Sequence, residues 1–308
     1  MAFLSTKDLL DLDNLKKEEI EEIIDLAIKL KAEGKNHLRA DLAGKSVGLV
    51  FNKPSTRTRV SFEVGTYQLG GSSLYLQATD LQMKRGETIG DTAKVLSSYL
   101  DAIVLRTHSH SDAEELAKHA TISVINALTD MFHPCQALAD LMTVYERKKS
   151  FEGLKIAYFG DGNNVCHSLI MAAAKVGLNL DIATPAAFEP DKEVLDKAKS
   201  ILSSGSINVS DDPEKAAADA DVLYTDVWIS MGDEDEEKER AKVFKPYQLN
   251  ESLLEMANSE AIVMHCLPAH RGQEITSGAM DSKNSAIFQQ AENRLYSQKA
   301  LLIGLIGN

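Results

Sequence analysis

A short polar cluster at residues 55–59 has the composition of an anion-binding site. The run Ser-Thr-Arg-Thr-Arg alternates three hydroxyls with two guanidiniums, directly behind an apolar segment that Pro54 ends. From Thr56 onward the chain can start a helix, whose free N–H groups and positive dipole end attract a phosphate. A capped helix with solvated arginines is the alternative, but it does not account for both arginines at a strand end.

Five further polar clusters also follow predicted strands. In open α/β sheets, ligands bind beyond the carboxyl ends of the strands. Taken singly, His133 could be a capping or core histidine, Cys266 a small buried hydrophobe and Asp226 a turn former. Six such coincidences favour a site. The five clusters are Arg106-Thr107-His108, His133-Pro134-Cys135-Gln136, Asn164, Asp226 and His265-Cys266-Leu267-Pro268.

Strands and helices alternate along the whole chain, which predicts an α/β protein with parallel sheets flanked by helices. A polar run at 146–150 marks a boundary between two domains, 1–147 and 148–284. The charge run 233–240 is expected to be a solvated loop or helix start, although such loops can also cover active sites. We predict strands at 46–51, 73–77, 102–105, 122–126, 155–159, 181–184, 222–225 and 262–265, and helices at 17–32, from 56, and at 88–100, 112–119, 135–147, 165–176, 192–202 and 285–305.

The composition is that of an ordinary globular protein of two domains. The chain has 308 residues and a net charge of −13, which argues against a nucleic-acid partner or an anionic membrane surface. Three isolated cysteines suggest neither a disulfide framework nor a structural zinc site, and a reducing cytoplasm fits them best. The first residues lack the pattern of a signal peptide, and no run has the length of a membrane span.

Two other phosphate-binding patterns fail on inspection. Gly44-Lys45-Ser46 resembles the end of a P-loop, but Arg39 stands where that motif needs glycine, and a strand follows. The run from Gly160 to Asn164 lies between a strand and a helix, as a dinucleotide fingerprint does, yet Val165 replaces the third glycine. These glycines are therefore expected to serve a tight turn, where asparagine amides could meet a polar ligand.

Four of these motifs together resemble those of a known family, and the resemblance covers almost the whole chain. Residues 55–59 and the His133-Pro134-Cys135-Gln136 run resemble the carbamoyl-phosphate motifs shared by the aspartate and ornithine carbamoyltransferases. The pair Asp226-x-Trp228-x-Ser230-Met231-Gly232 and His265-Cys266-Leu267-Pro268 resembles the motifs of the ornithine branch of that family.

This resemblance implies a fold and an assembly. It implies an N-terminal carbamoyl-phosphate domain, a second domain for ornithine, and a C-terminal helix, residues 285–308, that packs back on the first. It also implies a homotrimer or an assembly of trimers, in which Gln82 reaches into a neighbour's site. The loop 82–87 departs from the His-Lys-Glu-Ser form of some members, so the side chain that meets phosphate there stays open.

The implied reaction is attack of the δ-amine of L-ornithine on the carbamoyl carbon, which gives L-citrulline and phosphate. By resemblance Arg57 stabilises the leaving oxygen, Arg106 and His133 act on the carbonyl oxygen, and Asp226 and Cys266 assist deprotonation of the amine. Which group takes the proton is open, and neither a metal nor an organic cofactor is expected. The implied carbamoyl-phosphate contacts are Ser55, Thr56, Arg57, Thr58, Gln82, Arg106, His133, Pro134, Cys135, Gln136, Cys266, Leu267 and Arg294, and the implied ornithine contacts are Asn164, Asp226, Ser230 and Met231.

Two alternatives compete with this interpretation. The chain could be a carbamoyltransferase for another amine such as putrescine or aspartate, although the Ser230-Met231-Gly232 run favours ornithine. It could also be a non-catalytic paralogue that keeps the fold for assembly or regulation. A biosynthetic and a degradative direction of the reaction are equally compatible with the sequence.

Overall fold

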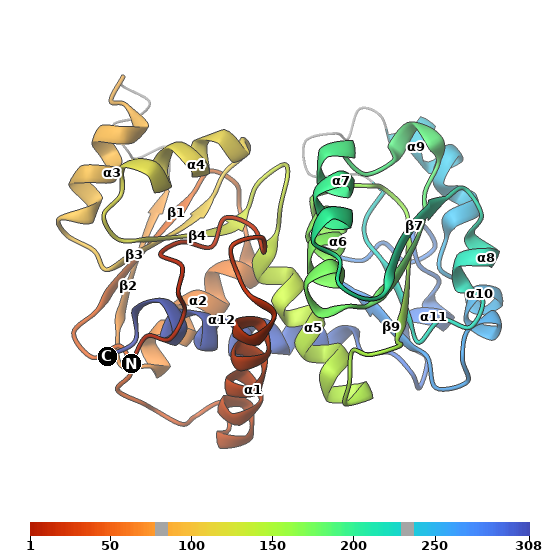
Figure 1. Ribbon diagram of the computed structural model, residues 1–308, viewed down its shortest axis with the longest axis horizontal. Helices are drawn as coiled ribbons and strands as arrows, with labels where there is room; N and C mark the ends of the chain where they lie inside the picture. Colours follow the sequence, from red (N-terminus) through yellow and green to blue (C-terminus); the bar gives the residue numbers. More distant parts are fainter. Residues whose placement is uncertain (78–85, 229–236) are drawn as a thin grey trace. The chain divides into compact units, whose positions relative to one another are not determined.

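The computed structural model describes residues 1–77, 86–228 and 237–308, which form two compact units (Figure 1). The first unit comprises Met1–Met142 and Glu292–Asn308, and the second comprises Thr143–Ala291. Each unit holds one parallel sheet with helices on both faces, so the predicted α/β class is confirmed. Most of the C-terminal helix α12 (Ile287–Ile306) belongs to the first unit, as expected.

The sheet of the first unit has the order β2-β1-β3-β4, and every pair is parallel. The three strands other than β2 are almost wholly buried, as expected for strands of a parallel sheet covered on both faces. Strand β2 lies at the edge and is partly exposed. The strands are β1 (Ser46–Phe51), β2 (Ser72–Gln77), β3 (Ala102–Arg106) and β4 (Ser123–Leu128).

Helices cover both faces of this first sheet. On one face, α3 and α4 lie side by side, and Ala93 and Leu116 pack on Ile103 of the sheet (Figure 1). On the other, α12 lies against α2, where Gly65 leaves room for the side chain of Lys299. The helices of this unit are α1 (Lys17–Glu33), α2 (Thr56–Gln68), α3 (Ile89–Ser97), α4 (His110–His119) and the start of α5 (Pro134–Lys148).

The sheet of the second unit has the parallel order β7-β6-β5-β8-β9. Helices α6 and α7 cover one face, and an apolar cluster joins α8, α10 and α11 to the other (Figure 1). The elements are β5 (Lys155–Phe159), α6 (Asn164–Val176), β6 (Asn179–Ala183), α7 (Lys192–Ile201), β7 (Ser206–Ser210), α8 (Pro213–Ala217), β8 (Val222–Thr225), α9 (Glu237–Phe244), α10 (Glu251–Met256), β9 (Ile262–His265) and α11 (Ser277–Met280), with 3-10 turns at Ala186–Phe188 and Lys245–Tyr247.

Four short elements of the second unit are absent from the sequence prediction. The edge strand β7 carries polar, mostly half-exposed residues and lacks the apolar run of a buried strand. Helices α8, α10 and α11 have only four to six residues, too few to establish a helical period. Within the part of the chain that is described, no helix has the length and apolar character needed to cross a membrane.

The strand order fixes where ligands can approach each sheet. In the first unit the order reverses between β1 and β3, and in the second between β5 and β8. Consecutive connections leave such a point on opposite faces, which opens a crevice at the carboxyl ends of the two strands. The 55–59 cluster follows β1 and Arg106 ends β3, while Asn163 and Asp226 follow β5 and β8. The candidate residues therefore lie where the topology leaves room for a ligand.

Candidate active site

Ser55 starts helix α2 and leaves its first turn open. Its backbone is extended (φ −157°, ψ 118°), and its Oγ accepts a hydrogen bond from the N–H of Thr58 at 3.3 Å. Thr56 and Arg57 are exposed on that turn, whereas Thr58 is buried. The sequence Ser-Thr-Arg-Thr thus presents a capped helix N-terminus with one exposed guanidinium, an arrangement suited to an anion.

The two arginines of the 55–59 cluster have different surroundings. The Nε of Arg59 donates to Glu63 at 3.0 Å, and its guanidinium lies 3.7 Å from the ring centroid of Tyr75. Arg57, in contrast, acts electrostatically on Arg106 and on His133. Arg57 therefore belongs to the candidate anion site, and Arg59 is engaged elsewhere.

A group of buried cations surrounds the end of β3. Arg106 is 5% exposed, and its pKa falls to about 10 because burial disfavours its charge and because Arg294 and Arg57 repel it. Burial and the same arginines, together with Arg106, hold the pKa of His133 well below its ordinary value near 6.5, so the imidazole is neutral. The Nε of Arg106 is buried and has no hydrogen-bond partner among the described residues. Such a cluster is costly unless an anion joins it.

Arg294 of α12 connects the first turns of α2 and α5. Its Nη1 donates to Oε1 of Gln136 at 2.6 Å, and its Nη2 donates to Oγ1 of Thr58 at 3.2 Å. The Nε2 of Gln136 in turn donates to Asp140 at 2.8 Å. Because the Thr58 oxygen already accepts from Arg294, its hydroxyl proton can point to a ligand. Three residues that the sequence predicted for one ligand are thus brought together.

Cys135 lies at the start of α5, but its thiol has a structural role. Burial raises the pKa of this thiol to about 12, and Sγ donates to the backbone carbonyl of Asn126 at 3.4 Å. A neutral, buried thiol is inert as a nucleophile. Pro134 begins the helix, where its missing N–H costs nothing. Any contact of Cys135 with a ligand would therefore use its backbone.

In the second unit, Asn163 makes polar contacts that define the β5–α6 turn. Its Oδ1 accepts from the N–H groups of Val165 and Cys166, and its Nδ2 donates to Asp226 at 2.9 Å. Asn164 is the half-buried first residue of α6. The glycines serve a tight turn, as expected, since Gly160 has φ of +127° and a Cβ at Gly162 would lie 2.3 Å from the backbone nitrogen of Pro190.

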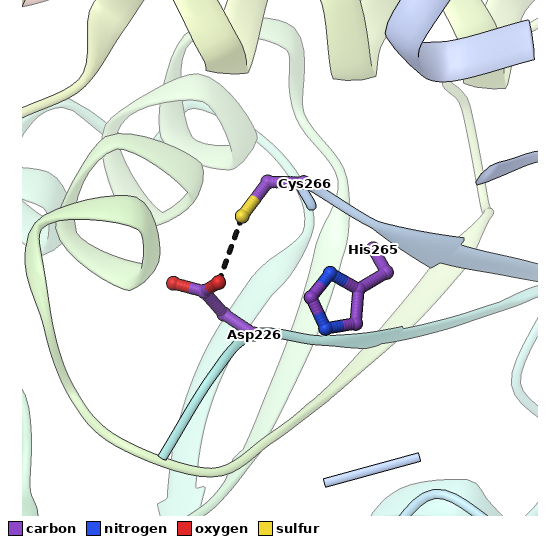
Figure 2. A group of neighbouring side chains, drawn as sticks. All are labelled: Asp226, His265 and Cys266. Atoms are coloured by element: carbon purple, nitrogen blue, oxygen red, sulfur yellow. Dashed lines mark hydrogen bonds between the residues drawn. The ribbon is translucent and has the colours of Figure 1, made fainter. Parts of the chain in front are cut away.

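Asp226 and Cys266 meet at the ends of β8 and β9, as Figure 2 shows. Asp226 is 5% exposed, and its Oδ1 accepts from the Cys266 thiol at 2.8 Å while Oδ2 accepts from Asn163. Each carboxylate oxygen can accept more than one hydrogen bond. The carboxylate is therefore held in a fixed orientation and can still accept from an ammonium group.

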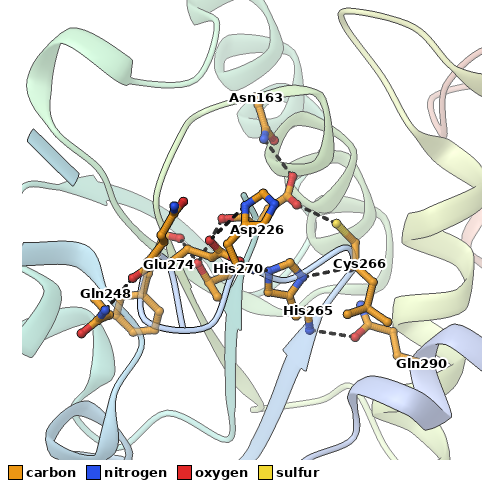
Figure 3. Close-up of polar contacts among 12 residues, drawn as sticks. Asn163, Asp226, Gln248, His265, Cys266, His270, Glu274 and Gln290 are labelled. Atoms are coloured by element: carbon orange, nitrogen blue, oxygen red, sulfur yellow. Dashed lines mark hydrogen bonds and ion pairs between the residues drawn. The ribbon is translucent and has the colours of Figure 1, made fainter. Parts of the chain in front are cut away.

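Behind Cys266, a buried histidine and glutamate fix the turn that follows β9 (Figure 3). The Nδ1 of His265 accepts from the N–H of Leu267 at 2.8 Å, so its proton lies on Nε2, which donates to Glu274 at 3.1 Å. The backbone N–H of His265 donates to Gln290 at 2.9 Å. Leu267 has φ of +60°, and the contact to His265 supports this conformation.

Asp226, His265 and Cys266 also have the side-chain types of a metal site. One possible ligand atom from each lies within 4.8 Å of the others. Both ring nitrogens of His265 are already engaged, however, with Leu267 and Glu274. The described geometry is therefore that of a hydrogen-bonded network.

Arg240 of α9 joins three segments of the second unit. Its Nε donates to the carbonyl of Trp228 at 2.8 Å, and its Nη2 pairs with Asp161 of the β5–α6 turn. The guanidinium also lies 4.7 Å from the ring centroid of Phe188 and 5.4 Å from that of Phe244. The charge run 233–240 is predicted to be a solvated loop or a helix start, and helix α9 begins within it at Glu237, but the side chain of Arg240 is only 11% exposed.

Three of the predicted site residues fall outside the described ranges, and three residues that support the site were not predicted to have a role in it. Gln82, Ser230 and Met231 lie outside the described residues. His265 is signalled in the sequence only by its place before Cys266, and Glu274 follows an irregular segment with no periodic pattern. Asp140 sits among apolar residues of a predicted helix, where a single carboxylate gives little signal.

Comparisons with known proteins identify the family of the chain. The family described as aspartate/ornithine carbamoyltransferase, carbamoyl-P binding domain, matches residues 7–146, and its Asp/Orn binding domain matches residues 152–305. An ornithine carbamoyltransferase of Anoxybacillus flavithermus is 56% identical over 306 residues, which is 98% of each chain. One from Bacillus cereus is 54% identical and covers 99% of this chain and 96% of its own.

Solved structures give the same result. An ornithine carbamoyltransferase from Pyrococcus furiosus has a TM-score of 0.93 at 50% identity and covers 99% of both chains. An anabolic ornithine carbamoyltransferase from Campylobacter jejuni has a TM-score of 0.91 at 38% identity and covers 97% of this chain and 99% of its own. The chain therefore belongs to the aspartate/ornithine carbamoyltransferase family.

Proposed function

We propose that this protein transfers the carbamoyl group of carbamoyl phosphate to the δ-amine of L-ornithine, giving L-citrulline and phosphate. The observation that carries the proposal is the pair of buried guanidiniums of Arg106 and Arg294 beside the neutral imidazole of His133, a place whose positive charge an anionic ligand would balance. The family membership and the relatives named ornithine carbamoyltransferase support the choice of substrates.

The phosphate would bind at the first turn of α2. Ser55, Thr56 and Thr58 supply hydroxyl and backbone donors, and Arg57 supplies the exposed guanidinium. Arg57 would also stabilise the charge that grows on the bridging oxygen as the bond to carbon breaks. Pro134, Cys135, Cys266 and Leu267 are proposed as further contacts, the last two through backbone groups.

The carbamoyl group would lie against Arg106, His133 and Gln136. Attack of the amine puts negative charge on the carbonyl oxygen, which the guanidinium of Arg106 and a ring N–H of His133 stabilise. Because the pKa of His133 is well below 6.5, the imidazole can donate this hydrogen bond while neutral and leaves the cationic charge to the arginines. Collapse of the tetrahedral intermediate expels phosphate.

Ornithine would bind through the second unit. Asp226 would attract the ammonium group of ornithine. The Cys266 thiol, which donates a hydrogen bond to Asp226, would lie beside the same amine. Only the neutral δ-amine attacks, so one of these groups or a water takes its proton. A pH profile of kcat/KM for Cys266→Ser that overlays that of the parent would exclude the thiol. Asn164, Ser230 and Met231 are proposed for the amino-acid end.

We further propose a homotrimer, or an assembly of trimers, in the cytoplasm. An exposed apolar stripe on α2 and the edge strand β2 supports contact with a second copy of the chain, and the three free thiols support a reducing compartment. Tyr67→Lys should lower the mass measured by light scattering, and an unchanged mass would remove this stripe from the interface. The stripe consists of Val60, Val64, Tyr67 and Leu74.

One assay tests the proposed function. Purified protein is incubated with carbamoyl phosphate and ornithine, and citrulline is measured by its colour reaction, with putrescine and aspartate as competing amines. We expect citrulline to form and the other amines to be poor acceptors. Equal turnover of putrescine would remove the ornithine assignment, and no product with any amine would favour a non-catalytic paralogue.

A further inference from the structure

We propose that Asp140 is a positioning residue that makes the acyl-phosphate site selective for a ligand with an N–H beside its carbonyl group. The residue lies on α5, one turn beyond Gln136, and is 1% exposed. One of its carboxylate oxygens accepts from Nε2 of Gln136 at 2.8 Å. The inference rests on the proposed function for the identity of the ligand, but its chemistry rests on these contacts alone.

The orientation of the Gln136 amide follows from its two neighbours. A guanidinium can only donate hydrogen bonds, and a carboxylate, when ionised, can only accept them. Gln136 lies between the two, with Oε1 accepting from Arg294 at 2.6 Å and Nε2 donating to Asp140. The reverse orientation would place two donors together and two acceptors together, so a single orientation is stable.

Other contacts hold the guanidinium in place. Arg294 donates to Thr58, and the Gln298 amide, with its oxygen turned to the guanidinium, accepts from Nε at 3.0 Å and from Nη2 at 2.8 Å. The Nε2 of Gln298 can then donate to Ser61. Gln136 is therefore fixed from both sides, by Arg294 at its oxygen and by Asp140 at its nitrogen.

This arrangement decides what Gln136 can recognise. An amide oxygen accepts two hydrogen bonds, and Arg294 uses one of them. The remaining lone pair can accept from the NH2 of a carbamoyl group but not from the methyl of an acetyl group, which has nearly the same shape. A site that hydrogen-bonds an N–H disfavours the analogue that lacks it, because the second lone pair of the buried oxygen is then left without a donor. Without Asp140 the amide could turn away, and this selection would weaken.

Two stable phosphonates test the inference by calorimetry. Phosphonoacetamide and acetonylphosphonate differ only in an NH2 in place of a methyl, and inorganic phosphate reports on the phosphate half alone. We expect the parent to bind phosphonoacetamide at least about tenfold more tightly than acetonylphosphonate. Asp140→Leu and Asp140→Ala should lose most of that ratio and keep the affinity for phosphate within about twofold. Asp140→Asn should retain the ratio, because its amide oxygen can still accept from Gln136.

A matched control separates this role from a general loss of packing. Glu19 is another buried carboxylate of the first unit, and it accepts from the backbone N–H groups of Ser5 and Lys16. Glu19→Leu should keep the ratio even if it lowers the melting temperature. The inference fails if the parent shows no preference, or if either apolar variant at position 140 keeps it. Because the readout is binding, absence of citrulline would count against the proposed function alone.

Discussion

The two units treat charge in opposite ways around their candidate residues. In the first, Arg106 and Arg294 are both buried. The pKa of Arg106 is lowered by its burial and by repulsion from the guanidiniums of Arg294 and Arg57. In the second, the buried carboxylate of Asp226 already has a donor from the protein on each oxygen. The orphaned buried Nε of Arg106 indicates a place for an anionic ligand, whereas hydrogen bonds from neutral donors to both oxygens hold the Asp226 carboxylate in one orientation.

This contrast matches the two substrates of the proposed reaction. Carbamoyl phosphate brings the negative charge that the first unit needs, so binding recovers electrostatic energy that folding left unsatisfied. Ornithine brings an ammonium that must be bound and then deprotonated. A rigid carboxylate with a thiol beside it can orient that amine at little cost in reorganisation.

Removing a buried cation should have the largest effect. We expect Arg106→Ala to lower kcat by about 10²–10³-fold, because one donor to a developing oxyanion is worth about 2.7–4 kcal/mol. Steady-state assays with both substrates measure this. Arg59→Ala is the matched control, since Arg59 pairs with Glu63 and stacks on Tyr75. Near-normal turnover of Arg106→Ala, or an equal loss in Arg59→Ala, would refute the assignment.

Neutralising the carboxylate of the second unit should affect only one substrate. We expect Asp226→Asn to lower kcat/KM for ornithine by about 10²-fold, because an ammonium loses its charged partner. The affinity for phosphonoacetamide should stay within about twofold, since the first unit is unchanged. Calorimetry with that compound and steady-state kinetics with ornithine give the two values. A parallel loss of both would show that the units do not divide the substrates in this way.

The sequence predicts the elements that bring these residues together better than it predicts their partners. Strand ends, helix starts and polar clusters are local patterns, so β1, α2 and the positions of Arg106 and Asp226 could be read from spacing. Arg59 shows the limit. It is chemically identical to Arg57 and two residues away, and only the helix geometry pairs it with Glu63.

Contacts between distant segments left no local signal. Glu274, in an irregular segment, accepts a hydrogen bond from His265. Arg240 pairs with Asp161, which lies 79 residues earlier in the sequence. In the sequence, Asp140 is an isolated carboxylate on an apolar helix. Its partner Gln136 is engaged by Arg294 of the last helix, a contact that the sequence does not indicate. The short α8, α10 and α11 were missed because tertiary packing, rather than periodicity, stabilises them.

The Arg240 contacts offer a milder test of the second unit. We expect Arg240→Met to raise KM for ornithine by about tenfold and leave KM for carbamoyl phosphate nearly unchanged, because the loss of about 1.4 kcal/mol from a charged hydrogen bond loosens the turn that carries Asn163. Arg240→Lys should recover part of this, since it keeps a charge for Asp161. Equal changes in both KM values would indicate a general loss of structure.

The smallest expected effect is a pH dependence of stability that arises because burial and the neighbouring arginines keep His133 neutral. Its pKa in the folded protein lies well below the unfolded value near 6.5, chiefly because the ring is buried and also because Arg294 and Arg106 repel its charge. Below pH 6.5 the unfolded chain therefore binds a proton that the folded protein does not, and stability falls as pH falls, by at most about 1.4 kcal/mol per pH unit. Urea midpoints at pH 5.5 and 7.0 measure this slope.

Replacing His133 and adding an anion test the origin of this pH dependence of stability. His133→Asn should reduce the loss of stability between pH 7.0 and 5.5, whereas His119→Asn, on the partly exposed face of α4, should leave it nearly as in the parent. Sulfate, which keeps its charge between these pH values, would offset the repulsion of His133 when bound beside the arginines, so a saturating concentration should reduce the slope in the parent and change it little in His133→Asn. If sulfate leaves the parent's slope unchanged, burial rather than repulsion by the arginines keeps His133 neutral in the folded protein at pH 5.5.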